Sequence, residues 1–155
     1  MWLLANPKVI YTGATVISVV STDILSKVIN LSLASLEHTF SYLTSSNLTS
    51  SIKKYQDDLE LLDIDLKLKL IDSWLKHINS NKIINDSPLA LIYNSVSDSC
   101  HKIAELVEKI NEKIKYHNTK WFQSWRSIYL DNEIKLLEKN VKILDERIKL
   151  IALIK

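Results

Sequence analysis

Glycine, proline and cysteine are nearly absent from this chain of 155 residues, which contains one Gly, two Pro and one Cys. All-β folds need frequent turn residues, so this scarcity favours long uninterrupted helices. A single Cys excludes an internal disulfide framework and a zinc site built on paired cysteines. One Gly cannot form a glycine-rich phosphate-binding loop. The sequence therefore predicts an all-α protein without these three kinds of site.

The balance of apolar and charged residues is that of a folded domain. Hydrophobic residues make up 46% and charged residues 25% of the chain, and both fractions are ordinary for globular proteins. A chain of this size buries about 70% of its unfolded surface, so it holds a core without metal or disulfides. The net charge of +2 gives no strong attraction to nucleic acid. Frequent Ile, Lys and Asn suit an AT-rich genome, such as that of some large viruses, symbionts or protists.

Hydrophobic periodicity divides the chain into four predicted helices, with Ser- and Asn-rich stretches between the first three. Their approximate ranges are 7–44, 52–79, 88–117 and 120–154. Asn6-Pro7 and Ser87-Pro88 are typical helix starts, because Asn and Ser cap free N–H groups and Pro suits the first helical position. Similar helix lengths and short loops predict a single domain, an antiparallel four-helix bundle. The alternative is a helical hairpin whose long C-terminal helix continues from Pro88 to Lys155 and packs in an oligomer.

The third predicted helix carries the clearest pattern in the chain. Apolar positions recur there at alternating steps of three and four, which is a heptad spacing. They are Tyr93, Val96, Cys100, Ile103, Val107, Ile110, Ile114, His117 and Trp121. The flanking positions lack the complementary charges that select partners in coiled coils. We therefore expect this seam to be an inner wall of the bundle, closed at one end by Trp121 and Trp125.

The second predicted helix contains a stretch that also resembles a strand. From Leu61 to Leu70 apolar and charged residues partly alternate, a pattern with the period of a half-buried strand. Leu and Lys favour helix, however, and a lone strand would have no partner. We therefore predict helix for this stretch.

The fourth predicted helix has three heptad lines of apolar residues. Together they cover roughly 160° of its surface, at about 100° per residue. Two-stranded coiled coils use a narrower stripe, so this helix is expected to face at least two neighbours. One of the lines is a candidate interface with another chain and consists of Leu136, Ile143 and Leu150.

Two further groups are candidate interfaces. An aromatic group with basic neighbours contains Trp121, Phe122, Trp125 and Tyr129. It suits a closed end of the core, a protein interface, or contact with nucleic acid or membrane. A ridge of small side chains at steps of four contains Ala14, Ser18, Thr22, Ser26, Asn30 and Ala34. Such a ridge lets another helix come close, in a bundle, an oligomer or a membrane.

No assembled catalytic or metal-binding set is recognisable. Cys100 and His101 are adjacent on a helix and point about 100° apart, so they do not form a thiolate–imidazole pair. Cys100 is expected to be a core side chain. One helical edge carries His101, Glu105, Glu108 and Glu112. Lysines interleave with these acids, so we expect a solvated, ion-paired face rather than a metal site. We predict no enzymatic activity, no cofactor and no metal.

These patterns favour a non-enzymatic structural or protein-interaction subunit, for example a component of a viral particle or a multi-subunit complex. Other proteins, or copies of the same chain, are the expected partners, and nucleic acid is not. The alternative is a membrane-associated helical protein acting through the small-residue ridge and the apolar termini. The apolar start lacks basic residues, so no signal peptide is predicted, and an intracellular site or an assembled particle is favoured.

Overall fold

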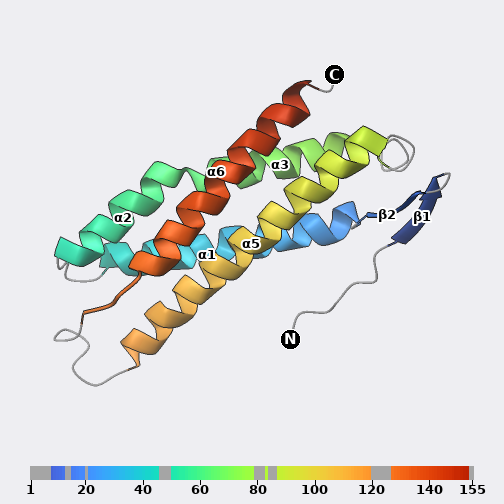
Figure 1. The fold of residues 1–155 in the computed structure, drawn as a ribbon. Helices are drawn as coiled ribbons and strands as arrows, with labels where there is room; N and C mark the ends of the chain where they lie inside the picture. Colours follow the sequence, from blue (N-terminus) through green and yellow to red (C-terminus); the bar gives the residue numbers. More distant parts are fainter. Residues whose placement is uncertain are drawn as a thin grey trace.

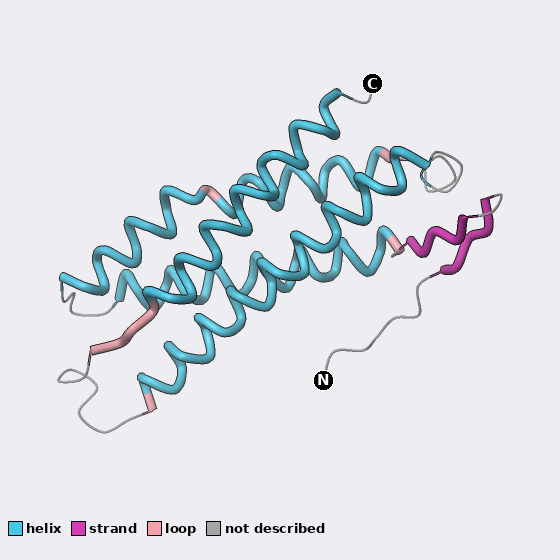
Figure 2. The backbone as a smooth tube through the Cα atoms, in the orientation of Figure 1, coloured by secondary structure: helices cyan, strands magenta, loops and turns pink. Residues whose placement is uncertain are grey.

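Four helical rods pack side by side, and a short β-hairpin precedes the first of them (Figures 1 and 2). The computed structural model describes residues 8–12, 15–19, 21–45, 50–78, 83, 87–119 and 127–153. Its elements are β1 (Lys8–Thr12), β2 (Thr15–Val19), α1 (Thr22–Ser45), α2 (Ser50–Leu62), α3 (Ile64–His77), α5 (Ser87–Asn118) and α6 (Asp131–Leu153). Helices α2 and α3 follow one another as a single rod, and consecutive rods run in opposite directions. The predicted antiparallel four-helix bundle is confirmed.

Polar contacts show which rods are neighbours on the α5 side of the bundle. The Tyr42 hydroxyl near the end of α1 lies 3.5 Å from the ring of His117 near the end of α5. These two helices pack along each other and are therefore parallel neighbours. The guanidinium of Arg147, late in α6, donates to the Ser95 carbonyl and the Ser99 hydroxyl, early in α5. Helices α5 and α6 are therefore antiparallel neighbours.

The α2–α3 rod lies on the other side, between α6 and α1. The Tyr55 hydroxyl of α2 donates to Asp131 at the start of α6 over 3.1 Å. Further along both rods, Lys67 donates to Asp145 over 3.0 Å, so the α2–α3 rod is parallel to α6. Ser26 of α1 donates to an oxygen of Asp72 in α3 over 2.7 Å. The order around the bundle is thus α1, α5, α6 and α2–α3, and the consecutive helices α3 and α5 occupy opposite corners.

The core is built around the predicted seam of α5. Every seam position from Tyr93 to Ile114 is at most 1% exposed. The small flanking side chains Ser97 and Ala104 are buried as well, and so is Ser32 of α1. Short side chains let two helix axes approach closely. The prediction of an inner wall is confirmed, whereas Trp121 and Trp125, the predicted plug, lie outside the described residues.

The first predicted helix begins too early. Residues 8–12 and 15–19 form an antiparallel pair of strands instead, with Lys8 opposite Val19 and Thr12 opposite Thr15. Both strands are rich in β-branched residues, which prefer extended backbone. The helix begins at Thr22, after the Ser21 carbonyl, which accepts bonds from the first-turn N–H groups.

The predicted small-residue ridge is therefore not one continuous helical line. Ser18 belongs to strand β2, and Ala14 lies outside the described residues. Within α1, Ser26 bonds to Asp72 of α3, and Ala34 is exposed. Among the described members of the ridge, Ser18 is in a strand and those from Thr22 onwards are helical.

The second predicted helix is divided at Asp63, whose backbone is left-handed with φ of 49°. Lys67 donates to the Leu62 carbonyl over 2.7 Å and so satisfies an acceptor at the break. The ambiguous stretch after Asp63 is helical, as predicted. Leu68 is fully buried while Leu66 and Leu70 are half-exposed, a pattern that a strand, with its period of two, would not give.

The fourth predicted helix begins later than residue 120. Helix α5 ends at Asn118, where the Thr119 hydroxyl donates to the Tyr116 carbonyl over 2.9 Å. Thr119 thus satisfies a carbonyl acceptor at the end of α5. Residues 127–130 are not helical, and α6 begins at Asp131. The alternative of one helix from residue 88 to 155 is wrong, because turning back lets α6 bury its apolar face on α5.

Replacing Leu68 by Ala tests the helical assignment of α3. Loss of this fully buried side chain is expected to lower the free energy of unfolding by about 2–5 kcal/mol, because a cavity remains. Leu70→Ala, on the outer face of the same helix, should change it by less than about 0.5 kcal/mol. Urea denaturation measures both. Equal losses for the two variants would contradict the assignment.

Substitutions at Asp63 test the break between α2 and α3. Gly adopts a left-handed backbone freely, so Asp63→Gly should keep the free energy of unfolding within about 1 kcal/mol of the original protein. A β-branched residue is strongly disfavoured there, and Asp63→Val should lower it by about 1–2 kcal/mol. Thermal and urea unfolding give these values. A Val variant as stable as the Gly variant would show that the two helices are continuous.

Candidate interaction surface

The outer face of α6 carries the predicted line of Leu136, Ile143 and Leu150, called here the α6 line. Each member directly precedes a residue of the core face (Leu137, Leu144 or Ile151), so it points about 100° away from that face. Leu136 and Leu150 are 48% and 46% exposed, and Ile143 is partly buried. The expected two neighbours of this helix are α5 and the α2–α3 rod, and the α6 line remains at least partly exposed beside them.

Helix α3 carries a second outward apolar group. Leu66 and Leu70 lie one turn apart and are half-exposed, on the side of the helix opposite the buried Ile64, Leu68 and Ile71. Isolated exposed leucines are normal on a protein surface. A repeated line along a helix is the more informative feature, because contiguous apolar surface marks interaction sites.

A buried carboxylate fixes α6 against α5. The Glu133 side chain, in the first turn of α6, is 5% exposed. One of its oxygens lies 2.7 Å from the ammonium of Lys113 and 3.5 Å from that of Lys109, both on α5. These lysines were expected to pair with acids of their own helix, and they reach across to α6 instead. Nothing at Glu133 in the sequence distinguishes it from an ordinary acidic residue at a helix start.

The lysines also set the protonation state of Glu133. Burial alone raises the pKa of its carboxyl group, but the hydrogen bond from Lys113, a backbone hydrogen bond and the charges of Lys113 and Lys109 together outweigh burial. The pKa therefore lies below its ordinary value, and the carboxylate is charged at neutral pH. Its second oxygen is buried and has no hydrogen-bond partner among the described residues. This arrangement holds only while the two lysines neutralise the charge.

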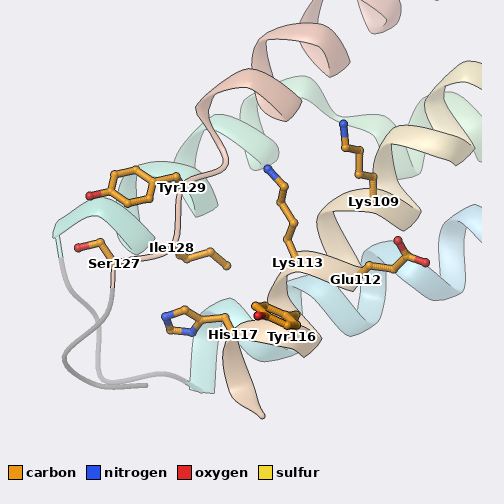
Figure 3. A pocket seen from close by; sticks show the side chains of 8 residues that line it. All are labelled: Lys109, Glu112, Lys113, Tyr116, His117, Ser127, Ile128 and Tyr129. Carbon is orange, nitrogen blue, oxygen red and sulfur yellow. The ribbon is translucent and has the colours of Figure 1, made fainter. Parts of the chain in front are cut away.

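A pocket of about 550 Å³ opens beside this cluster (Figure 3). Tyr116 and His117 form one wall from the last turn of α5, and Ser127, Ile128 and Tyr129 form another from the segment before α6. Tyr129, a predicted interface residue, is 74% exposed here, whereas Ile128 is buried. The pocket thus joins exposed aromatic surface to the end of the core.

The pocket offers no obvious catalytic arrangement. Lys109 and Lys113 line it, but both ammonium groups are already engaged by Glu133. The one thiol of the sequence, that of Cys100, is buried in the core, as predicted. Burial raises its pKa to about 12. A thiol with that pKa stays protonated at neutral pH, which makes it a poor nucleophile. Within the described ranges, no three His, Cys, Asp or Glu side chains gather to hold a metal.

The other predicted interface residues divide into three groups. Thr22 and Ser26 are partly buried at the start of α1, and Ser26 already bonds to Asp72. Ser18 lies in strand β2. The predicted residues outside the described part of the chain are Ala14, Trp121, Phe122 and Trp125. The α6 line is thus the predicted surface that the structure displays most completely.

Glu133→Gln tests the link between α5 and α6. At neutral pH it should lower the free energy of unfolding by about 1–2 kcal/mol, because a charge-assisted hydrogen bond is lost. Folding lowers the pKa of Glu133 below its ordinary value of 4.5, so the charged carboxylate stabilises the fold fully above pH 4.5. This stabilisation is lost as the pH falls through the lower pKa of the folded state. The difference in the free energy of unfolding between Glu133→Gln and the original protein should therefore become smaller as the pH is lowered.

Urea denaturation over a series of pH values measures this difference. Glu138→Gln, at an exposed position of the same helix, is the matched control and should have little effect at any pH. A difference for Glu133→Gln that stays constant down to the lowest pH would contradict the assigned role of the carboxylate.

Comparison with known proteins gives one informative relative. No family model and no solved structure matches the chain. The chain is 31% identical to the uncharacterized protein L717 of Acanthamoeba polyphaga mimivirus over 115 residues, and the match covers 57% of this chain. The chain spans about half the length of this curated relative, 56%. The similarity relates part of this chain to a mimivirus protein and carries no statement about activity.

Proposed function

We propose that this protein is a non-enzymatic subunit that acts by binding other protein chains within a larger assembly. The observation that carries the proposal is the α6 line. Among the residues that the structure describes, twenty-seven buried side chains form one core cluster that does not include the half-exposed leucines of α6. Regularly spaced apolar residues outside a finished core are typical of surfaces that another chain covers.

Two further observations support an interaction role over catalysis. The buried carboxylate of Glu133 is paired with Lys113 and links α6 to α5. The pocket beside α5 has its lysines engaged and combines Tyr116 and Tyr129 with apolar surface. Exposed tyrosines are enriched at protein interfaces, where their rings bury area and their hydroxyls stay hydrated.

The similarity to a mimivirus protein supports a viral setting for that assembly. The composition, rich in Ile, Lys and Asn, points the same way. A component of a viral particle and a subunit of a virus-encoded complex both fit this proposal, and both require that the outer surface of the bundle contact other chains.

Binding to a membrane surface is the second candidate. The N-terminal ridge that first suggested it is not a continuous helix, since residues 15–19 form β2. Among the described residues, no helix has the length and apolar character needed to cross a bilayer. What favours lipid is the basic border of the α6 line, formed by Lys135, Lys139, Lys142 and Lys149. An amphipathic helix of this kind lies on anionic lipid with its apolar face down.

Cross-linking in the cells that make the protein tests the proposed function. An amine-reactive reagent should join Lys139 and Lys142, beside the α6 line, to lysines of other chains. Leu136→Glu together with Leu150→Glu should abolish these cross-links, because charges would replace the apolar contact. Leu91→Glu, at a 62% exposed position of α5, is the matched control and should leave them intact.

Mass spectrometry locates the cross-links, and size-exclusion chromatography of the same extract gives the size of the complex. The proposal is wrong if the protein elutes as a monomer from that extract and every cross-link lies within a single chain.

A further inference from the structure

The α6 line is symmetric about its central residue. Leu136 lies seven residues before Ile143, and Leu150 lies seven residues after it. The two leucines are almost equally exposed, at 48% and 46%. A two-fold rotation that reverses the helix at Ile143 therefore places Leu136 opposite Leu150 of a second, antiparallel copy. The line is thus self-complementary in its apolar residues.

The charges beside the line have the same symmetry. Lys139 lies four residues before Ile143 and Glu146 three residues after it, so both project about 40–60° to the same side of the line. In an antiparallel pair related by a two-fold axis, that side of one helix meets the same side of the other. Lys139 then lies within one residue of the level of Glu146 in the second copy, and Glu146 faces Lys139 in return.

Both charged groups are available for such a contact. In the ranges that the structure describes, neither Lys139 nor Glu146 takes part in an ion pair. The other side of the line is already occupied, since Arg147 there binds the Ser95 carbonyl and the Ser99 hydroxyl of α5. In a parallel pair this side of one helix would meet the other side of the second line, where Asn140 and the already engaged Arg147 lie, so Lys139 would not reach Glu146 of the second copy. The charge pattern therefore selects the antiparallel arrangement.

We propose that the occupant of the α6 line is a second copy of this chain, bound through antiparallel pairing of the two α6 helices about Ile143. This inference rests on the proposed function, because it names the partner for that surface. Helix α6 has 23 residues and is about 35 Å long. Pairing one face of this length makes a small isologous interface, so we expect a reversible dimer with a dissociation constant on the order of 1–100 µM.

Sedimentation velocity of the purified full-length protein over a range of concentrations tests the proposal. The original protein should pass from monomer to dimer, and no further, as the concentration rises. Leu136→Glu should weaken the dimer at least about tenfold, because two apolar contacts per dimer become charged. The matched control is Leu70→Glu, at a 52% exposed position of α3, which should leave the dissociation constant unchanged. Circular dichroism confirms that each variant is folded.

Charge reversal tests the antiparallel register. Lys139→Glu and Glu146→Lys should each weaken the dimer by about three- to tenfold, because each places like charges opposite one another at two symmetric positions. The double variant Lys139→Glu/Glu146→Lys should restore the original affinity, since the reversed pair is again self-complementary. Only a pairing of Lys139 with Glu146 between copies predicts this recovery.

Four results would overturn the proposal. The first is a protein that stays monomeric at every concentration, and the second is a dimer weakened by Leu70→Glu but not by Leu136→Glu. The third is a double variant that dimerises no more tightly than the single variants. The fourth is a protein that forms no dimer in solution and whose attachment to vesicles of anionic lipid is strengthened by Glu146→Lys. The last result would assign the α6 line to a lipid surface. A monomeric purified protein that still forms α6-dependent cross-links to other proteins in cells would refute the self-pairing and leave the proposed function intact.

Discussion

Complete burial of the α5 seam is the constraint on which the rest of the structure depends. From Tyr93 to Ile114 no seam residue is more than 1% exposed, and the flanking Ser97 and Ser99 are buried as well. A face this wide needs more than one neighbour, and α1 and α6 supply the two that run along it. The α2–α3 rod closes the opposite corner and meets α5 through the rings of Trp74 and Tyr93, whose centres are 6.2 Å apart. The parallel packing of α1 on α5 follows from this arrangement.

Polar contacts then decide how α6 is turned against α5. Apolar side chains alone would tolerate a rotation or a shift of the helix, whereas a buried carboxylate has few acceptable partners. Glu133 meets Lys113 near one end of α6, and Arg147 meets Ser99 near the other. These two contacts fix the rotation of the helix, and so they leave the α6 line outside the core. The surface proposed for interaction is thus a consequence of the internal register.

The sequence was sufficient for features that repeat over many residues. The all-α class, the buried seam and the helical state of residues 64–77 all rest on periodicity over several turns. The break after the third helix was predicted at residue 117, and α5 ends at Asn118. The break at Asp63 and the start of α6 as late as Asp131 escaped prediction, because no Gly or Pro marks either position and tertiary packing determines where the chain turns. The β1–β2 hairpin was missed because its short side chains also fit a step of four, although their β-branching favoured strands. The sequence also showed three apolar lines on α6. Which of these lines faces outward depends on the contact of Glu133 with its lysines, which the sequence does not reveal.

The difference between the two outward apolar groups shows where specificity lies. Beside Leu66 and Leu70 of α3, Lys69 is paired with Asp65 of its own helix at 2.7 Å. Lys69 and Asp65 already neutralise each other, so this group presents apolar area without a free charge that would orient a partner. Beside the α6 line, Lys139 and Glu146 have opposite signs and no such pairing within their helix among the described residues. Because charge complementarity fixes register and excludes wrong partners, α6 can select one partner in one orientation. Helix α3, in contrast, exposes apolar area beside charges that are already paired within the helix.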